Sequence, residues 1–157
     1  MKITVSNELH HFNALYAEVD NLYHEAASLL GLSDSALYLF YSLVELGDGI
    51  AQHDICTLFG LSRQTIHSCV SALARQGLVE LHKGKGRERR IFLTEKGRKL
   101  IEERIIPFIA LEKAIIGDWS PEEWQMLLTL LKRYRDSFRA HLPMLEGIVK
   151  EEKPFRT

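Results

Sequence analysis

The sequence predicts a mostly α-helical protein with one small β-hairpin. Three observations predict this class: apolar residues at helical spacing over long stretches, capping residues at the starts of those stretches, and a glycine-rich basic segment between two alternating arms. The chain has 157 residues, of which 46% are hydrophobic, and a formal net charge of -1. This composition allows one domain or two small ones to bury a core, and it argues against a disordered chain.

Two helices are predicted at the start of the chain. Over residues 7–30 the apolar positions follow steps of three and four, which is a heptad seam, and Gly31 ends the helix. Ser33 can cap a second helix over about 34–46, which stops at Gly47-Asp48-Gly49. The seam consists of Leu9, Phe12, Tyr16, Val19, Tyr23, Ala26 and Leu30.

The last part of the chain predicts two longer helices. Thr94 can cap one over about 95–117, which Pro107 should kink because it removes a backbone donor. Ser120, Pro121 and Glu123 form a capping box with proline at the first position, so a final helix starts there. We expect this helix to bury Trp124, Leu127, Leu128, Leu131, Tyr134 and Phe138.

The middle of the chain fits a helix-turn-helix. Helices are predicted at about 51–59 and 63–76, separated by Gly60, which tolerates a positive φ, and by the N-cap candidate Ser62. On the second helix one face is apolar, while the opposite face carries short polar side chains that suit base edges and phosphates. The apolar face consists of Ile66, Cys69, Val70 and Leu73. The alternative is an ordinary corner between two core helices.

A basic hairpin follows this pair of helices directly. Leu78 to Leu93 contains two alternating arms around the segment KGKGRERR, which reads as two strands with a flexible tip. Residues 60–100 carry ten bases against three acids, whereas residues 1–59 sum to -7 and residues 101–157 to -1. Such segregation is typical of a patch that binds a polyanion, although a solvated basic surface would show the same charge. A basic hairpin beside a recognition-type helix predicts a winged helix.

The chain resembles the MarR (multiple antibiotic resistance regulator) family of winged-helix transcription factors. The resemblance is carried by LSRQTIHSCVSALARQGLVEL and RRIFLTEKGRKL, within residues 58–100. It implies an obligate homodimer that binds a pseudo-palindromic operator, with a winged helix-turn-helix domain at 33–100 and a helical dimerisation region formed by 1–32 and 101–157. The apolar seam and the Trp124–Phe138 stripe support a dimer independently, because they exceed what the chain's own short helices can cover. Packing within one chain is the alternative.

The predicted DNA contacts lie on the recognition helix and on the wing. On the recognition helix they are Ser62, Arg63, Gln64, Thr65, His67, Ser68 and Arg75. On the wing they are Lys83, Lys85, Arg87, Arg89 and Arg90. One departure matters: the family wing commonly carries Asp-x-Arg, and alignment places Arg87 on the arginine but Lys85 on the aspartate, so the aspartate that would buttress the arginine is missing.

The resemblance also implies a small-molecule effector site between the dimerisation helices and the winged domain. Its candidate residues are Tyr16, Tyr23, Tyr38, Tyr41 and Phe108, for each of which core packing is the alternative. No metal site is expected, because the seven histidines do not combine with cysteine or carboxylate ligands at a convincing spacing. Cys56 and Cys69 are expected to act as small apolar side chains.

We therefore expect a cytoplasmic, homodimeric, sequence-specific DNA-binding regulator, and the resemblance to the MarR family implies that it is a repressor. No nucleophile-base pair, phosphate-binding glycine loop or carboxylate dyad is present, so an enzyme is not expected, and neither is a cofactor. No apolar run is long enough to span a membrane, and the N-terminus lacks the pattern of a secretory signal. Two alternatives remain open at this point: a winged-helix module that binds an acidic protein, and a metal- or thiol-responsive regulator.

Overall fold

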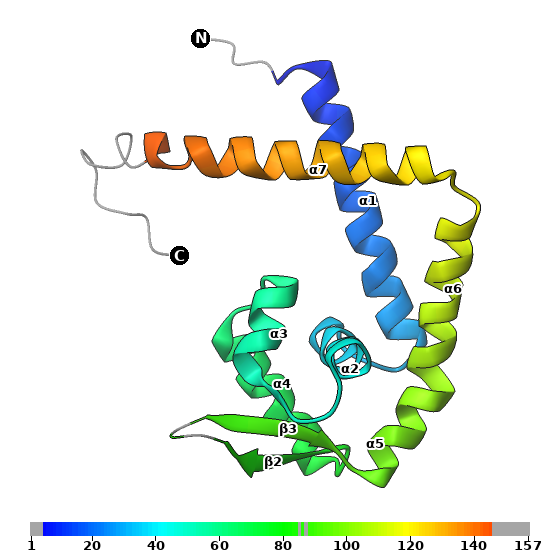
Figure 1. The fold of residues 1–157 in the computed structure, drawn as a ribbon, viewed down its shortest axis with the longest axis vertical. Helices are drawn as coiled ribbons and strands as arrows, with labels where there is room; N and C mark the ends of the chain where they lie inside the picture. Colours follow the sequence, from blue (N-terminus) through cyan, green and yellow to red (C-terminus); the bar gives the residue numbers. More distant parts are fainter. Residues whose placement is uncertain (1–4, 85, 87, 146–157) are drawn as a thin grey trace. The chain divides into compact units, whose positions relative to one another are not determined.

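A computed structural model describes residues 5–84, 86 and 88–145. The chain divides into two compact units, Met1–Ile109 and Ala110–Thr157. Along the chain lie α1 (Asn7–Leu29), α2 (Asp34–Leu46), β1 (Ile50–Ala51), α3 (Gln52–Phe59), α4 (Arg63–Arg75), β2 (Val79–Lys83), β3 (Arg89–Leu93), α5 (Glu95–Leu100), a π-helical turn (Ile101–Ile105), α6 (Ile106–Gly117) and α7 (Pro121–His141) (Figure 1). The predicted class, mostly α with a small β-hairpin, is confirmed.

The helix starts follow the predicted caps. Ser33, Ser62, Thr94 and Ser120 each accept a hydrogen bond from the backbone N–H three residues later. The Glu123 carboxylate also accepts from the Ser120 N–H at 2.8 Å, which completes the capping box. These bonds satisfy N–H groups that a helix cannot pair internally, so they fix where each helix begins.

Helix α2 lies at the centre of the first unit. Its side chains are buried around most of its circumference, with Leu39 and Phe40 fully enclosed. The core continues through α3, α4, the sheet, the π-helical turn and the start of α6. Its largest fully buried side chains outside α2 are Ile55, Ile66, Val70, Val79, Ile91 and Ile105. The helix-turn-helix and the hairpin therefore pack on the same hydrophobic core.

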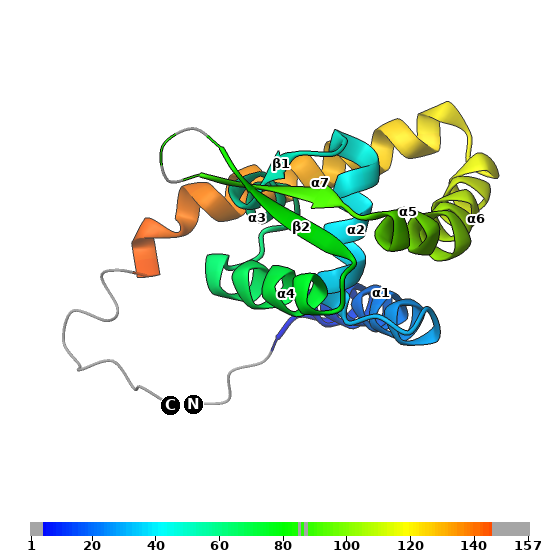
Figure 2. The same cartoon turned by 90° about the horizontal axis from the view of Figure 1, so that it is seen from below.

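The hairpin belongs to a three-stranded antiparallel sheet that the sequence did not predict. The order is β1-β3-β2, with Ile50 opposite Ile91 and Leu81 opposite the same Ile91 on the other side (Figure 2). Strand β1 has two residues, too few to show any alternation, and it occupies part of the segment predicted as loop and helix. Gly49 directly precedes this strand and has φ +83°. A Cβ at this position would collide with the Phe92 ring.

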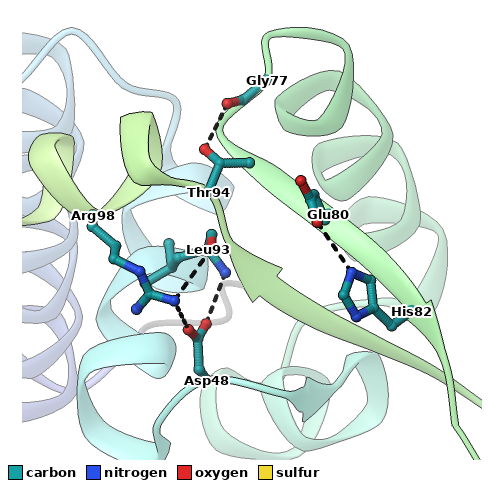
Figure 3. A network of polar contacts seen from close by, with 7 residues as sticks. All are labelled: Asp48, Gly77, Glu80, His82, Leu93, Thr94 and Arg98. Carbon is teal, nitrogen blue, oxygen red and sulfur yellow. Dashed lines mark hydrogen bonds and ion pairs between the residues drawn. The ribbon is translucent and has the colours of Figure 1, made fainter.

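The base of the hairpin is tied to the helices by polar contacts (Figure 3). Asp48 accepts a hydrogen bond from the Leu93 N–H and pairs with the Arg98 guanidinium. Thr94 donates its hydroxyl hydrogen to the Gly77 carbonyl at 2.7 Å while its oxygen caps α5. Both ends of the hairpin are thereby anchored.

The helix predicted at 95–117 changes its winding before Pro107. The Ile106 N–H bonds to the Ile101 carbonyl, five residues back, so one wider turn separates α5 from α6. In a regular α-helix the Pro107 ring would collide with the carbonyl four residues back, and a wider turn is a known way to relieve this conflict.

In α7 the expected burial is wrong for the single chain. Leu128, Leu131, Tyr134 and Phe138 are 44–56% exposed, and Trp124 and Leu127 are half-buried. Helix α1 likewise exposes Leu9, Tyr16 and Val19. Amphipathic spacing predicts an apolar face but does not say whether this chain or another molecule covers it.

No single helix among the described residues is long and apolar enough to cross a membrane. Helices α1 and α2 reach the required apolar content only as a pair, and they meet at a bend of 85°.

Candidate nucleic-acid interface

The helix-turn-helix forms at the predicted residues. Gly60 ends α3 in the left-handed conformation with φ 65, and the Ser62 hydroxyl accepts from the Thr65 N–H at 3.0 Å to start α4. The inner face of α4 is buried as expected, with Ile66 and Val70 fully enclosed. Helix α4 is thereby fixed through its apolar face, which leaves the opposite face in solvent.

All seven predicted contacts on this helix are exposed. Arg63, Gln64, His67, Ser68 and Arg75 are therefore accessible to a partner. Ser62 and Thr65 differ, because their hydroxyl oxygens lie 2.7 Å apart at the helix cap and already share a hydrogen bond. Their first role is to fix the start of α4.

The predicted wing residues divide between two roles. Lys83 and Arg89 face each other across the hairpin and are both exposed. Arg90 instead donates to the Gly49 carbonyl at 2.9 Å and pairs with Glu88 at 3.3 Å, so it braces β3 against the segment before β1. Lys85 and Arg87 lie outside the described residues, and their wing assignments stay predictions.

An open cleft of about 770 Å³ lies between α3, α4 and β3. It brings three predicted contact residues together, Arg63 and His67 from α4 and Arg89 from β3. The remaining lining residues, which sequence reasoning did not assign to DNA, are Ala51, Gln52, His53, Cys56 and Glu88. Gln52 and His53 begin α3, and the only signal for them in the sequence is that the first helix of a helix-turn-helix crosses the DNA backbone.

The predicted effector residues form separate aromatic groups. Tyr38 stacks on Phe59 with ring centroids 4.7 Å apart, and Tyr41 meets the same ring edge-on at 6.1 Å. Tyr23 contacts Phe108 edge-on at 6.2 Å, and Tyr16 lies on Phe12. Burial, followed by the charges of Asp20 and Asp34, raises the pKa of the Tyr38 hydroxyl.

The two cysteines occupy different environments. Cys69 is buried in the core face of α4, and this burial raises the pKa of its thiol, an effect that a hydrogen bond with Ser35 partly opposes. Cys56 is half-buried at the cleft. Within the described ranges, no three histidine, cysteine or carboxylate side chains are grouped closely enough to hold a metal ion.

Comparisons with known proteins agree with this geometry. Residues 30–90 match the model of the MarR family. Among solved structures, the chain is similar to a MarR family regulator from Neisseria meningitidis, with a TM-score of 0.79 and 19% identity over 88% of this chain and 99% of that one. No curated protein sequence matches the chain.

Two further structures are similar in fold. One is a complex of MepR from S. aureus with DNA, with a TM-score of 0.67 and 22% identity over 85% of this chain and 99% of that one. The other is the PcaV transcriptional regulator from Streptomyces coelicolor with its natural ligand, with a TM-score of 0.66 and 19% identity over 85% of this chain and 98% of that one. The segment 30–90 thus belongs to the MarR family, and the chain has the winged-helix fold of MarR-family transcriptional regulators.

Proposed function

We propose that the chain is a cytoplasmic transcriptional repressor that binds a pseudo-palindromic DNA operator as a homodimer. The observation that carries the proposal is the exposed polar face of α4 beside the basic wing, both held by one core. Base edges in a major groove are read by short hydrogen-bonding side chains, and phosphates are held by arginine and lysine. MepR, a protein of similar fold, was solved in complex with DNA, which supports the proposal.

Binding is tested first with a random-sequence duplex at low salt. A DNA-binding protein retains sequence-independent affinity for phosphates, which falls as salt rises. A specific site is then found by selection of bound duplexes from a random pool. Failure to bind any duplex would favour the alternative, a module that docks an acidic protein on the same basic face.

The dimer is proposed from the apolar faces that the chain leaves uncovered. Leu131 lies on the exposed stripe of α7, where a carboxylate would be buried in a dimer interface at high cost. Leu131→Glu should therefore shift the sedimentation coefficient towards the monomer. Arg133→Glu, on the opposite face of the same helix by its spacing, should leave the dimer intact. A Leu131→Glu protein that stays dimeric would contradict this interface.

Release by a small-molecule effector is the remaining part of the proposal. PcaV, a protein of similar fold, was solved in complex with its natural ligand. A compound library is screened for release of a bound duplex, and active compounds are tested on Phe108→Ala, which removes the ring that Tyr23 contacts. Loss of release with unchanged DNA affinity supports a pocket at these rings. Release that depends on zinc, a chelator or an oxidant would favour a metal- or thiol-responsive regulator instead.

A further inference from the structure

The cleft between α3, α4 and β3 gathers two histidines as well as two arginines. His53 comes from α3, His67 and Arg63 come from α4, and Arg89 comes from β3. Arg63 and His67 are four residues apart, so their side chains project from the same side of α4. Both histidines are exposed, and a ligand in the cleft would meet both imidazoles.

The anionic groups around the cleft already have partners. The Asp54 carboxylate lies 3.1 Å from the His53 ring nitrogen Nε2 and also accepts the Ala51 N–H at the start of α3. Glu88 pairs with Arg90 at 3.3 Å. The remaining titratable group, the Cys56 thiol, adds no positive charge. The charge offered to a ligand is therefore positive, and it increases when the imidazoles take up protons.

We propose that this cleft binds a phosphate of the DNA backbone through Arg63, Arg89, His53 and His67, and that DNA binding takes up protons onto the two imidazoles. The inference rests on the proposed DNA-binding function. A bound phosphate favours the protonated form of each ring, because a negative charge beside an imidazole stabilises its positive charge. Each imidazole takes one proton from solvent at a ring nitrogen, and no other bond forms or breaks.

The consequence is that the affinity for DNA rises as the pH falls. A histidine ordinarily titrates near pH ~6.5. If the bound phosphate favours the protonated ring about tenfold, linkage makes binding about six-fold tighter at about pH 6 than at about pH 8 for each histidine. The gain is absent at high pH, because an imidazole well above its ordinary pKa carries no proton with or without a phosphate beside it.

The test is the affinity for a labelled random-sequence duplex, measured by fluorescence anisotropy across this pH range at constant ionic strength. A random duplex is sufficient because phosphate contacts carry no sequence information. The variants are His53→Gln, His67→Gln and the double variant. The control is His24→Gln, which removes an exposed histidine that pairs with Asp34 at 2.9 Å on α1.

Each single variant should lose about half of the pH dependence on a logarithmic scale, the double variant should lose nearly all of it, and His24→Gln should match the original protein. A double variant that keeps the original pH dependence overturns the inference. Binding at about pH 8 tests the proposed function separately, because the histidine contribution is then nearly absent. Binding there without a histidine-dependent slope overturns only the inference, whereas absence of binding at every pH overturns the proposed function.

Discussion

The Asp48 carboxylate accepts a hydrogen bond from the Leu93 N–H at 2.7 Å, across 45 residues of sequence. Its other oxygen pairs with Arg98, so one side chain joins the loop after α2, the end of β3 and the last turn of α5. This side chain is thus one of the contacts that tie the wing to the helices.

Asp48→Ala should lower the free energy of unfolding by about 1–3 kcal/mol, because the Leu93 N–H loses its acceptor. The ion pair with Arg98, which is half exposed, adds about 1 kcal/mol at most. Asp48→Asn retains an oxygen acceptor and should cost less. Urea unfolding measures both variants, and an Asp48→Ala protein as stable as the original would show that the contact does not hold the wing base.

Gly97→Ala should destabilise the fold by about 3 kcal/mol or more. A Cβ at Gly97 would overlap the carbonyl oxygen of Leu78, and backbone cannot move away as a flexible side chain can. Gly117→Ala is the matched control, since a Cβ there meets nothing within 4 Å. Thermal unfolding of the two variants gives the comparison, and similar melting temperatures would contradict the close approach of α5 to the Leu78 carbonyl.

Arg89→Ala should reduce the salt dependence of DNA binding by about one unit of slope, because one phosphate contact is lost. The adjacent Arg90→Ala should mainly lower the stability, since that guanidinium braces the Gly49 carbonyl. Affinity is measured over a salt series, together with urea unfolding of each variant. A reversed pattern would assign the phosphate contact to Arg90.

Gln64→Ala should relax the preference at one operator position by about 1–3 kcal/mol, because an exposed amide on α4 can make two hydrogen bonds to a base edge. Binding is measured on a set of duplexes substituted one base pair at a time. Affinity for a random duplex should change little, and a uniform loss across all duplexes would instead indicate a phosphate contact.

Cys56 should react with a thiol reagent well before Cys69. Because burial raises the pKa of Cys69, its reactive thiolate is scarce at neutral pH and becomes abundant only as the pH rises above this raised value. The rate of thiol modification is followed colorimetrically at several pH values, and the variants Cys56→Ser and Cys69→Ser show which cysteine reacts fast and which reacts slowly. Equal rates at neutral pH would show that Cys69 is not protected.

Local signals predicted much of the fold. A serine or threonine cap, a glycine with positive φ and a repeating apolar face each act within one or two turns, and Ser62, Gly60 and Ile66 take the expected places. Strand β1 was missed because its stability comes from pairing with β3 rather than from its own two residues.

The site was predicted less completely than the fold. Charge and spacing predicted Arg63, His67 and Arg89, and these side chains do line one cleft. They could not separate Arg89 from Arg90, because adjacent residues of a strand point to opposite faces and only the tertiary structure shows which face is occupied. Gln52 and His53 reach the cleft through the angle between α3 and α4, which no local pattern specifies.

The short strand β1 has a mechanical consequence. Ala51 pairs with Arg90 of the wing strand, and α3 begins at the next residue, with its first turn fixed by Asp54. No loop of even one residue separates the sheet from the helix-turn-helix. The wing strand therefore cannot tilt without turning the first helix of the motif, so in the proposed complex with DNA a movement of either one would displace both.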